Sequence, residues 1–199
     1  MKVVFVLFDS LNRSAISPYA GGAVTTPNFA RLAQRAVTFD KHYVGSMPCM
    51  PARRDMDTGG LNFLHRNWGP LEPFDNSLPQ LLRSSGTYAH MITDHYHYFH
   101  DGGATYHNRF SSYEFVRGQS TDDWKAVVEP PLDDFAKQYH KAQQRPFTLN
   151  DKINRLYIRD EPEFTCPQVF GLADEFLDTN GRADNWFLQV ESFDPHEPF

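Results

Sequence analysis

The chain has 199 residues, of which 40% are hydrophobic, 22% are charged and only two are cysteines. These values exclude a wholly disordered chain and a disulfide-stabilised scaffold, and they suit one domain or part of a larger one. The formal net charge of −6 disfavours a nucleic-acid-binding protein, because such proteins are usually basic.

The first predicted element is a strand over Lys2–Phe8. Its run of apolar, largely β-branched residues is typical of a buried strand in a parallel sheet. The apolar part of this run, Val3–Phe8, is too short for a membrane span or a signal-peptide core. We therefore expect a cytoplasmic protein without a membrane partner.

A helix and a second strand are predicted next. Residues 25–27 read Thr-Thr-Pro, which supplies a capping residue and a proline for a first helical turn. The apolar face of this helix would consist of Phe29, Leu32, Ala33 and Ala36. After the helix, Val37–Val44 is predicted to form a strand.

The middle of the chain predicts one more helix and strand, followed by irregular structure. A helix opens at Ser77-Leu78-Pro79 and is expected to stop at Gly86. Tyr88–Thr93 follows as a strand. Residues 94–131 carry histidines, glycines and aromatics without clear periodicity, so we expect mostly loop there.

The last third predicts two helices and a final strand. Leu132–Gln144 is expected to be helical, and the polar stretch 145–163 is expected to be an excursion on the surface. Pro167–Asp178 has the apolar spacing of a helix, which would end near Gly181. Asn185–Phe193 is the final predicted strand.

Strands and helices alternate along the chain, which predicts an α/β fold with a doubly wound sheet. Ligands of such folds bind at the carboxyl ends of the strands. Asp9, Asp94 and His196 each follow a predicted strand, so they are candidates for one common site. Because no closing helix precedes Phe199, we expect the chain to be cut off on its C-terminal side.

Residues 49–59 contain the pattern C-x-P-x-R, followed by four residues and Thr-Gly. This pattern resembles the signature of type I sulfatases. Val4–Ser10, Thr26-Pro27-Asn28 and Val37–Val44 resemble the segments that precede the signature in that family, and Ser192–Phe199 resembles its later histidine loop. The resemblance implies an alkaline-phosphatase-like three-layer sandwich with a mostly parallel sheet. Residues 1–199 would be the N-terminal part of a single catalytic domain.

In that family the signature cysteine is oxidised to Cα-formylglycine by a formylglycine-generating maturation enzyme. The resemblance carries this role to Cys49. The hydrated aldehyde offers one hydroxyl to attack the sulfur of a sulfate ester, and the second hydroxyl then loses its proton and expels sulfate. Arg53 would stabilise the ionised diol with its permanent charge. We expect a helix from about Arg53, whose N-terminus would favour an anion.

The resemblance also implies a divalent metal. Asp9 resembles the first metal-binding aspartate of the family, and the implied ligand set here is Asp9, Ser10 and Cys49. Most members have two consecutive aspartates at this place, whereas this chain has Asp9-Ser10. Ca²⁺ is the first expectation, with Mn²⁺ or Mg²⁺ as alternatives. The family's other metal ligands and a later lysine have no match in this chain.

Two regions resemble histidine-bearing parts of the family's site. His196 resembles the histidine that binds substrate or protonates the leaving oxygen. Many members carry Gly-Lys-x-His where this chain reads Thr93-Asp94-His95-Tyr96-His97. We expect His97 to be catalytic, and His95 and Asp94 to contact substrate, although Asp94 replaces the lysine.

Several alternatives stay open. The resemblance favours hydrolysis of a small-molecule or carbohydrate sulfate ester. The second hypothesis is a phosphonate monoester or phosphodiester hydrolase of the same superfamily. The third hypothesis is a non-catalytic protein with this fold. Histidines between residues 90 and 107 also suggest a separate zinc site, since His-x-His is a plausible ligand pair, with members His90, His95, His97, His100 and His107.

Overall fold

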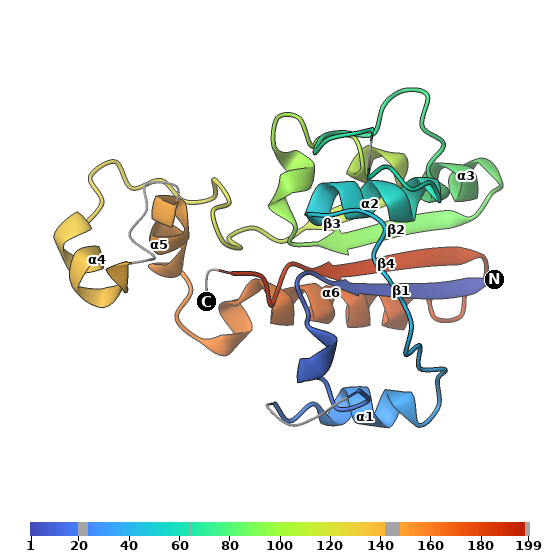
Figure 1. Cartoon of the computed structure of the whole chain (residues 1–199), viewed down its shortest axis with the longest axis horizontal. Helices are drawn as coiled ribbons and strands as arrows, with labels where there is room; N and C mark the ends of the chain where they lie inside the picture. The colour runs from blue at the N-terminus through green and yellow to red at the C-terminus, as the bar shows by residue number, and fades with distance from the viewer. Residues whose placement is uncertain (20–23, 64, 142–147, 198–199) are drawn as a thin grey trace.

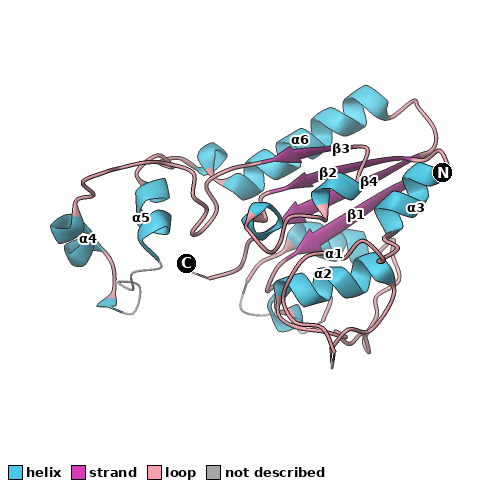
Figure 2. Cartoon of the chain, turned by 90° about the horizontal axis from the view of Figure 1, so that it is seen from above, coloured by secondary structure: helices cyan, strands magenta, loops and turns pink. Residues whose placement is uncertain are grey.

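The computed structural model describes residues 1–19, 24–63, 65–141 and 148–197 (Figure 1). Its centre is a four-stranded sheet with the order β1-β4-β2-β3, and every pairing is parallel. The strands are β1 (Lys2–Phe8), β2 (Tyr88–Thr93), β3 (Ser112–Phe115) and β4 (Trp186–Ser192). Figure 2 shows all four arrows pointing toward the same edge, so the loops after the strands gather there.

Helices cover both faces of the sheet and give three layers. Helices α2 (Cys49–Thr58) and α3 (Leu78–Ser84) lie on one face, and α6 (Thr165–Asn180) lies on the other, with α1 (Pro27–Ala33) on the same side as α6 (Figure 1). The expected α/β fold with a parallel sheet is therefore confirmed.

The remaining helices lie outside these layers. Helices α4 (Leu132–Gln138) and α5 (Leu149–Arg155) lie beyond the carboxyl ends of the strands (Figure 1). Short 3₁₀ turns occur at Arg13–Ala15, Tyr96–Phe99, His107–Arg109 and Glu161–Glu163. No helix in the described ranges is long and apolar enough to cross a membrane.

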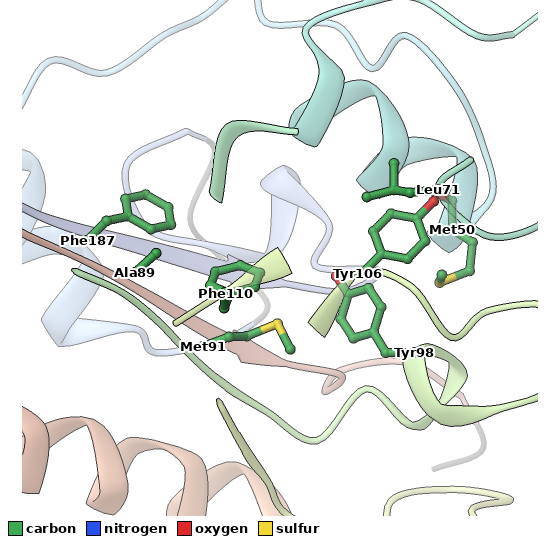
Figure 3. Close-up of a cluster of buried hydrophobic side chains, with 8 residues drawn as sticks. All are labelled: Met50, Leu71, Ala89, Met91, Tyr98, Tyr106, Phe110 and Phe187. Carbon is green, nitrogen blue, oxygen red and sulfur yellow. The ribbon is translucent and has the colours of Figure 1, made fainter. Parts of the chain in front are cut away.

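Alternating side chains of the central strands pack into two hydrophobic cores, one on each face of the sheet. The core beneath α2 and α3 is shown in Figure 3 and consists of Met50, Leu71, Ala89, Met91, Tyr98, Tyr106, Phe110 and Phe187. The core beneath α6 consists of Ile92, Val116, Val169, Ala173, Phe176, Trp186, Leu188 and Val190. Because successive residues of a strand point to opposite faces, β2 and β4 are buried on both sides.

Three predicted strands are confirmed, with bounds that differ by at most one residue from those of β1, β2 and β4. The predicted helices at Pro27, Leu78 and Pro167 correspond to α1, α3 and α6. Gly86 ends the region of α3 as expected, since its φ of +83° is one that glycine adopts without a steric penalty.

The predicted strand at Val37–Val44 is wrong. This segment forms no strand and is exposed throughout, with Val37 80% and Tyr43 82% accessible. Strand β1 pairs with β4 and has no second partner among the described residues. An apolar run cannot form a strand without a neighbour to share its backbone hydrogen bonds, so composition alone was misleading here.

Other expectations need correction in their bounds. The loop predicted over 94–131 contains β3, and the surface excursion predicted over 145–163 contains α5, which buries Asp151, Lys152, Ile153 and Asn154. Helix α4 ends at Gln138, and residues 142–144 of the longer helix we predicted lie outside the described ranges. Helix α2 begins at Cys49 itself, one turn earlier than expected.

We expect the loss of side-chain volume in the central strand β4 to lower the free energy of unfolding strongly. Leu188 is fully buried in the core beneath α6, so Leu188→Ala removes packed methyl groups and leaves a cavity. We expect the free energy of unfolding to fall by about 2–5 kcal/mol in urea titrations. Leu61→Ala is the matched control, because Leu61 is 74% exposed and its loss should cost less than about 0.5 kcal/mol. Equal costs for the two variants would contradict this placement of the core.

Candidate active site

The loops after β1, β2 and β4 meet α2 at the carboxyl edge of the sheet. Hydrogen bonds and an ion pair connect five of the residues singled out from the sequence, namely Asp9, Cys49, Arg53, His95 and His97. They come from places up to 88 positions apart in the chain, so the parallel topology is what assembles them.

Arg53 is the central cation of this group. It lies one turn after Cys49 on α2, is 5% exposed, and donates from Nη1 to the Cys49 carbonyl oxygen at 3.3 Å. Its Nη1 lies 2.7 Å from Asp9 Oδ2, and its Nε and Nη2 donate to Glu191 Oε1 at 3.0 and 2.7 Å. Burial alone would lower the pKa of Arg53, but the Glu191 and Asp9 charges raise it, so the guanidinium stays charged.

Glu191 is the site residue that the sequence analysis missed. It sits in β4, is fully buried, and accepts hydrogen bonds from Arg53, from His95 Nδ1 at 2.9 Å and from the Tyr98 hydroxyl at 2.8 Å. Burial works against its charge, yet Arg53 and the hydrogen bond from His95 lower the pKa of Glu191 to about 2. The signal was available, because a glutamate near the end of an otherwise buried strand requires a charged partner.

The thiol of Cys49 faces a histidine. Its Sγ lies 3.5 Å from His97 Nδ1, and the side chain is half-buried at the first position of α2. Burial raises the pKa of Cys49, whereas the Arg53 charge and a hydrogen bond with Trp68 lower it, and burial dominates. The free cysteine is therefore held mainly as a neutral thiol.

Both histidines beside Cys49 are neutral. Burial, followed by the nearby His95, His100 and His196, lowers the pKa of His97 to about 3. His95 is fully buried, which lowers its pKa, and its Nε2 lies 3.2 Å from His97 Nδ1. Gly103 helps to fix this turn, because a Cβ at position 103 would overlap the carbonyl oxygen of His97.

Asp9 fits a hard cation as one ligand. Its Oδ2 is buried and has no well-aligned hydrogen-bond donor, although the charge of Arg53 lies beside it. Ser10 donates its hydroxyl to Asp9 Oδ1 at 3.0 Å. Ca²⁺ takes about six to eight oxygen ligands. The described side chains at this place supply one carboxylate, and Cys49 offers a soft sulfur, so they can supply only part of such a shell.

Asp94 and His196 both contact Phe193. Asp94 is fully buried, and its Oδ1 accepts a hydrogen bond from the Phe193 backbone N–H at 2.6 Å. Burial raises the pKa of Asp94 to about 7. His196 is partly exposed, and its ring stacks on that of Phe193 with centroids 4.3 Å apart. The contacts of Asp94 in the structure are thus with the protein interior, while His196 faces the edge of the site.

The suggested histidine cluster assembles only in part. In the described ranges, the possible metal ligands that come together as a group of three are His95, His97 and Cys49. His90 instead hydrogen-bonds Ser112 and stacks on Phe176 of α6.

Comparison with known proteins gives a consistent result for the whole chain. A family model described as Sulfatase matches residues 2–199. A relative from Escherichia coli (strain K12), described as uncharacterized sulfatase YidJ, is 25% identical over 199 aligned residues. These cover 98% of this chain and 38% of YidJ, so the chain spans well under half of that relative's length.

Solved structures show the same fold. BT4656 in complex with its substrate D-glucosamine-2-N,6-O-disulfate superposes with a TM-score of 0.65 at 18% identity, covering 98% of this chain and 34% of BT4656. The phosphonate monoester hydrolase of Agrobacterium radiobacter superposes with a TM-score of 0.60 at 22% identity, covering 99% of this chain and 41% of the hydrolase.

The buried pair of Glu191 and Arg53 predicts an acid-sensitive contribution to stability. The pKa of Glu191 lies below its ordinary value of 4.5, so its stabilising effect is complete above about pH 4.5 and is lost as the pH falls toward 2. Glu191→Gln should lower the free energy of unfolding by about 3–5 kcal/mol at neutral pH. The difference in the free energy of unfolding between wild type and variant should become smaller as the pH falls from 4.5 to 2, as measured by urea titrations. Glu175→Gln, at an exposed position, is the control, and a gap independent of pH would contradict the assignment.

Asp94 predicts the opposite pH dependence. Its folded pKa of about 7 lies above its ordinary value of 3.8, so its contribution to stability is complete below about pH 3.8 and is lost as the pH rises through 7. Asp94→Asn keeps the acceptor for the Phe193 N–H and cannot ionise. Relative to wild type, the variant should therefore gain stability between pH 4 and pH 7 in thermal denaturation. The exposed Asp178→Asn serves as control, and a loss of stability at pH 7 in Asp94→Asn would overturn this prediction.

Proposed function

Because this chain belongs to the sulfatase family, we propose that it forms the nucleophile-bearing part of a sulfuric ester hydrolase. The reaction would be hydrolysis of a sulfate monoester, with Cys49 converted to formylglycine by a maturation enzyme. One observation carries the proposal: Cys49 begins α2, with Arg53 and His97 within hydrogen-bonding reach of it at the carboxyl edge of the sheet. The hydrated aldehyde supplies a nucleophilic oxygen and a route for its release.

Arg53 would orient the group at position 49 and balance negative charge there. It is held from both sides by Asp9 and Glu191, so its side chain is fixed before any substrate arrives. A preorganised charge stabilises developing charge without first having to reorient. The position of Arg53 one helical turn after Cys49 supports this role.

The two histidines would have different roles. His97 is neutral, with a pKa of about 3, so at neutral pH it would hold the group at position 49 by a hydrogen bond from Nδ1 without taking up its proton. His196 is partly exposed and lies at the edge of the site, which suits an acid that protonates the leaving oxygen. In place of the expected substrate contacts of His95 and Asp94, whose side chains are fully buried, we propose that His95 keeps His97 in place and that Asp94 holds the backbone at Phe193.

A divalent metal is part of the proposal. Asp9 would hold it, with Ca²⁺ as the first candidate and Mn²⁺ or Mg²⁺ as alternatives, and Ser10 and the converted Cys49 would lie nearby. When bound, such a cation would polarise an oxygen of the sulfuryl group. Asp9 Oδ2 is buried and lacks a well-aligned hydrogen-bond donor, which supports this assignment.

The charge of the site favours a singly charged ester. Arg53 faces two carboxylates, so the local sum of +1 from Arg53 and −2 from Asp9 and Glu191 is −1, and a divalent cation at Asp9 would raise this sum to +1. That charge would balance a monoanionic ester, whereas a dianionic phosphate monoester would leave an excess of negative charge. The same reasoning admits a phosphonate monoester or a phosphodiester, which is the second candidate substrate class. A sulfated carbohydrate is the first, because BT4656 is described with a sulfated glucosamine as its substrate.

The test uses the full-length reading frame, co-expressed with a formylglycine-generating enzyme. Hydrolysis of an aryl sulfate is compared with hydrolysis of the matching aryl phosphonate monoester. We expect preferred sulfate release, and Cys49→Ala should lower kcat by at least about 1000-fold because the nucleophile is lost. Mass spectrometry of the peptide that contains residue 49 shows how much of the cysteine was converted.

Cys166→Ala is the matched control, since the other cysteine lies on α6 and should not affect the rate. Preferred cleavage of the phosphonate would favour the second substrate class. Activity that is unchanged in Cys49→Ala would overturn the proposed nucleophile for both substrate classes.

A further inference from the structure

We propose that the protein, while Cys49 is still a cysteine, binds Zn²⁺ through the Cys49 thiolate and the imidazoles of His95 and His97. Each of these three side chains offers one ligand atom, and the three atoms all lie within 4.8 Å of one another. One thiolate and two imidazoles are ligands that suit Zn²⁺. This inference goes beyond ester hydrolysis and does not rest on it.

The distances agree with tetrahedral coordination. Zinc bonds of about 2.0–2.1 Å to nitrogen and about 2.3 Å to sulfur place two tetrahedral nitrogens about 3.3 Å apart, and a nitrogen and a sulfur about 3.5 Å apart. In the structure, His95 Nε2 lies 3.2 Å and Cys49 Sγ lies 3.5 Å from His97 Nδ1. The third side, from Cys49 Sγ to His95 Nε2, needs a contraction of at most about 1.3 Å.

His95 Nε2 has the unprotonated form that metal binding requires. Its Nδ1 lies 2.9 Å from Glu191, which is ionised and can only accept, so Nδ1 carries the proton of this neutral ring. The lone pair of Nε2 therefore points toward His97. A carboxylate behind a histidine is the arrangement that fixes the tautomer of zinc-binding histidines in many proteins.

The protons of the site rearrange when a cation binds. His97 Nδ1 carries the proton that it donates to His95 Nε2, and Cys49 Sγ lies 3.5 Å from the same nitrogen, so Nδ1 offers a lone pair to a metal only after that proton has moved. Binding of Zn²⁺ moves the His97 proton from Nδ1 to Nε2 and releases the Cys49 proton to solvent. One Zn²⁺ is taken up and one proton is released, and no oxidant or reductant is needed.

Three protein ligands leave the fourth tetrahedral position for water, which is the arrangement of open zinc sites. Conversion of Cys49 to formylglycine removes the sulfur and replaces a soft ligand by oxygen. The zinc site would therefore belong to the unconverted protein and disappear on maturation, whereas the hard-cation site at Asp9 would not require the sulfur.

The experiment uses unconverted, full-length protein without substrate. Competition with a chromophoric chelator measures Zn²⁺ affinity, and Co²⁺ is used as a spectroscopic probe. We expect one Zn²⁺ per chain, release of one proton, and a sulfur-to-cobalt charge-transfer band in the near ultraviolet. Cys49→Ser should abolish that band, and Cys49→Ser and His97→Gln should each weaken Zn²⁺ binding by at least about tenfold.

Matched controls are Cys166→Ser and His107→Gln, which remove the same ligand types at positions outside the cluster. Circular dichroism checks that each variant folds, and the formylglycine-converted wild type removes the sulfur without a mutation. Equal Zn²⁺ affinity in Cys49→Ser and wild type, loss of binding in Cys166→Ser, or no binding by folded wild type would each overturn the proposal. Because no turnover is measured, none of these results bears on the hydrolase assignment.

Discussion

The arrangement of the site depends on the buried carboxylate of Glu191. A carboxylate on a fully buried strand is costly to bury unless hydrogen-bond donors surround its oxygens. Glu191 meets this requirement through Arg53 of α2, His95 of the loop after β2, and Tyr98 of the following turn. Each bond ties a separate element to β4, so the same group that satisfies the buried charge also sets the position of α2 relative to the sheet.

This arrangement explains how a strong cation and several unprotonated histidines coexist. Arg53 remains charged because two carboxylates flank it, and His95 remains neutral because it is buried beside that cation. His97 is neutral for the same reasons and lies against the thiol. The site thus keeps lone pairs and a fixed positive charge within one small volume, which is useful for binding anions as well as for binding metals.

The sequence predicted the parts of the fold that have strong local signals. Lys2–Phe8 and Tyr88–Thr93 are strands because their apolar runs are buried between layers, and the end of each strand correctly marked where Asp9 and Asp94 would lie. Val37–Val44 has a similar composition but finds no neighbouring strand, and local sequence carries no information on that. Short β3 was missed because four residues give too little periodicity.

The site was predictable only as separate residues. The spacing of Cys49 and Arg53 on one helix is local, so their proximity followed from the sequence. The approach of His97 to Cys49 and the pairing of Glu191 with Arg53 depend on how α2 and the turn after β2 pack against β4. Side-chain contacts between residues tens or hundreds of positions apart are set by topology and packing, which no local pattern encodes.

Phe193, directly after β4, contacts the rings of both loops that carry histidines. Its centroid lies 4.8 Å from that of His95, 5.7 Å from that of His97 and 4.3 Å from that of His196. The same ring therefore lies against histidines from two different loops. A change in the orientation of Phe193 would alter the packing around His97 and His196 together, so the two loops share one packing constraint at the end of β4.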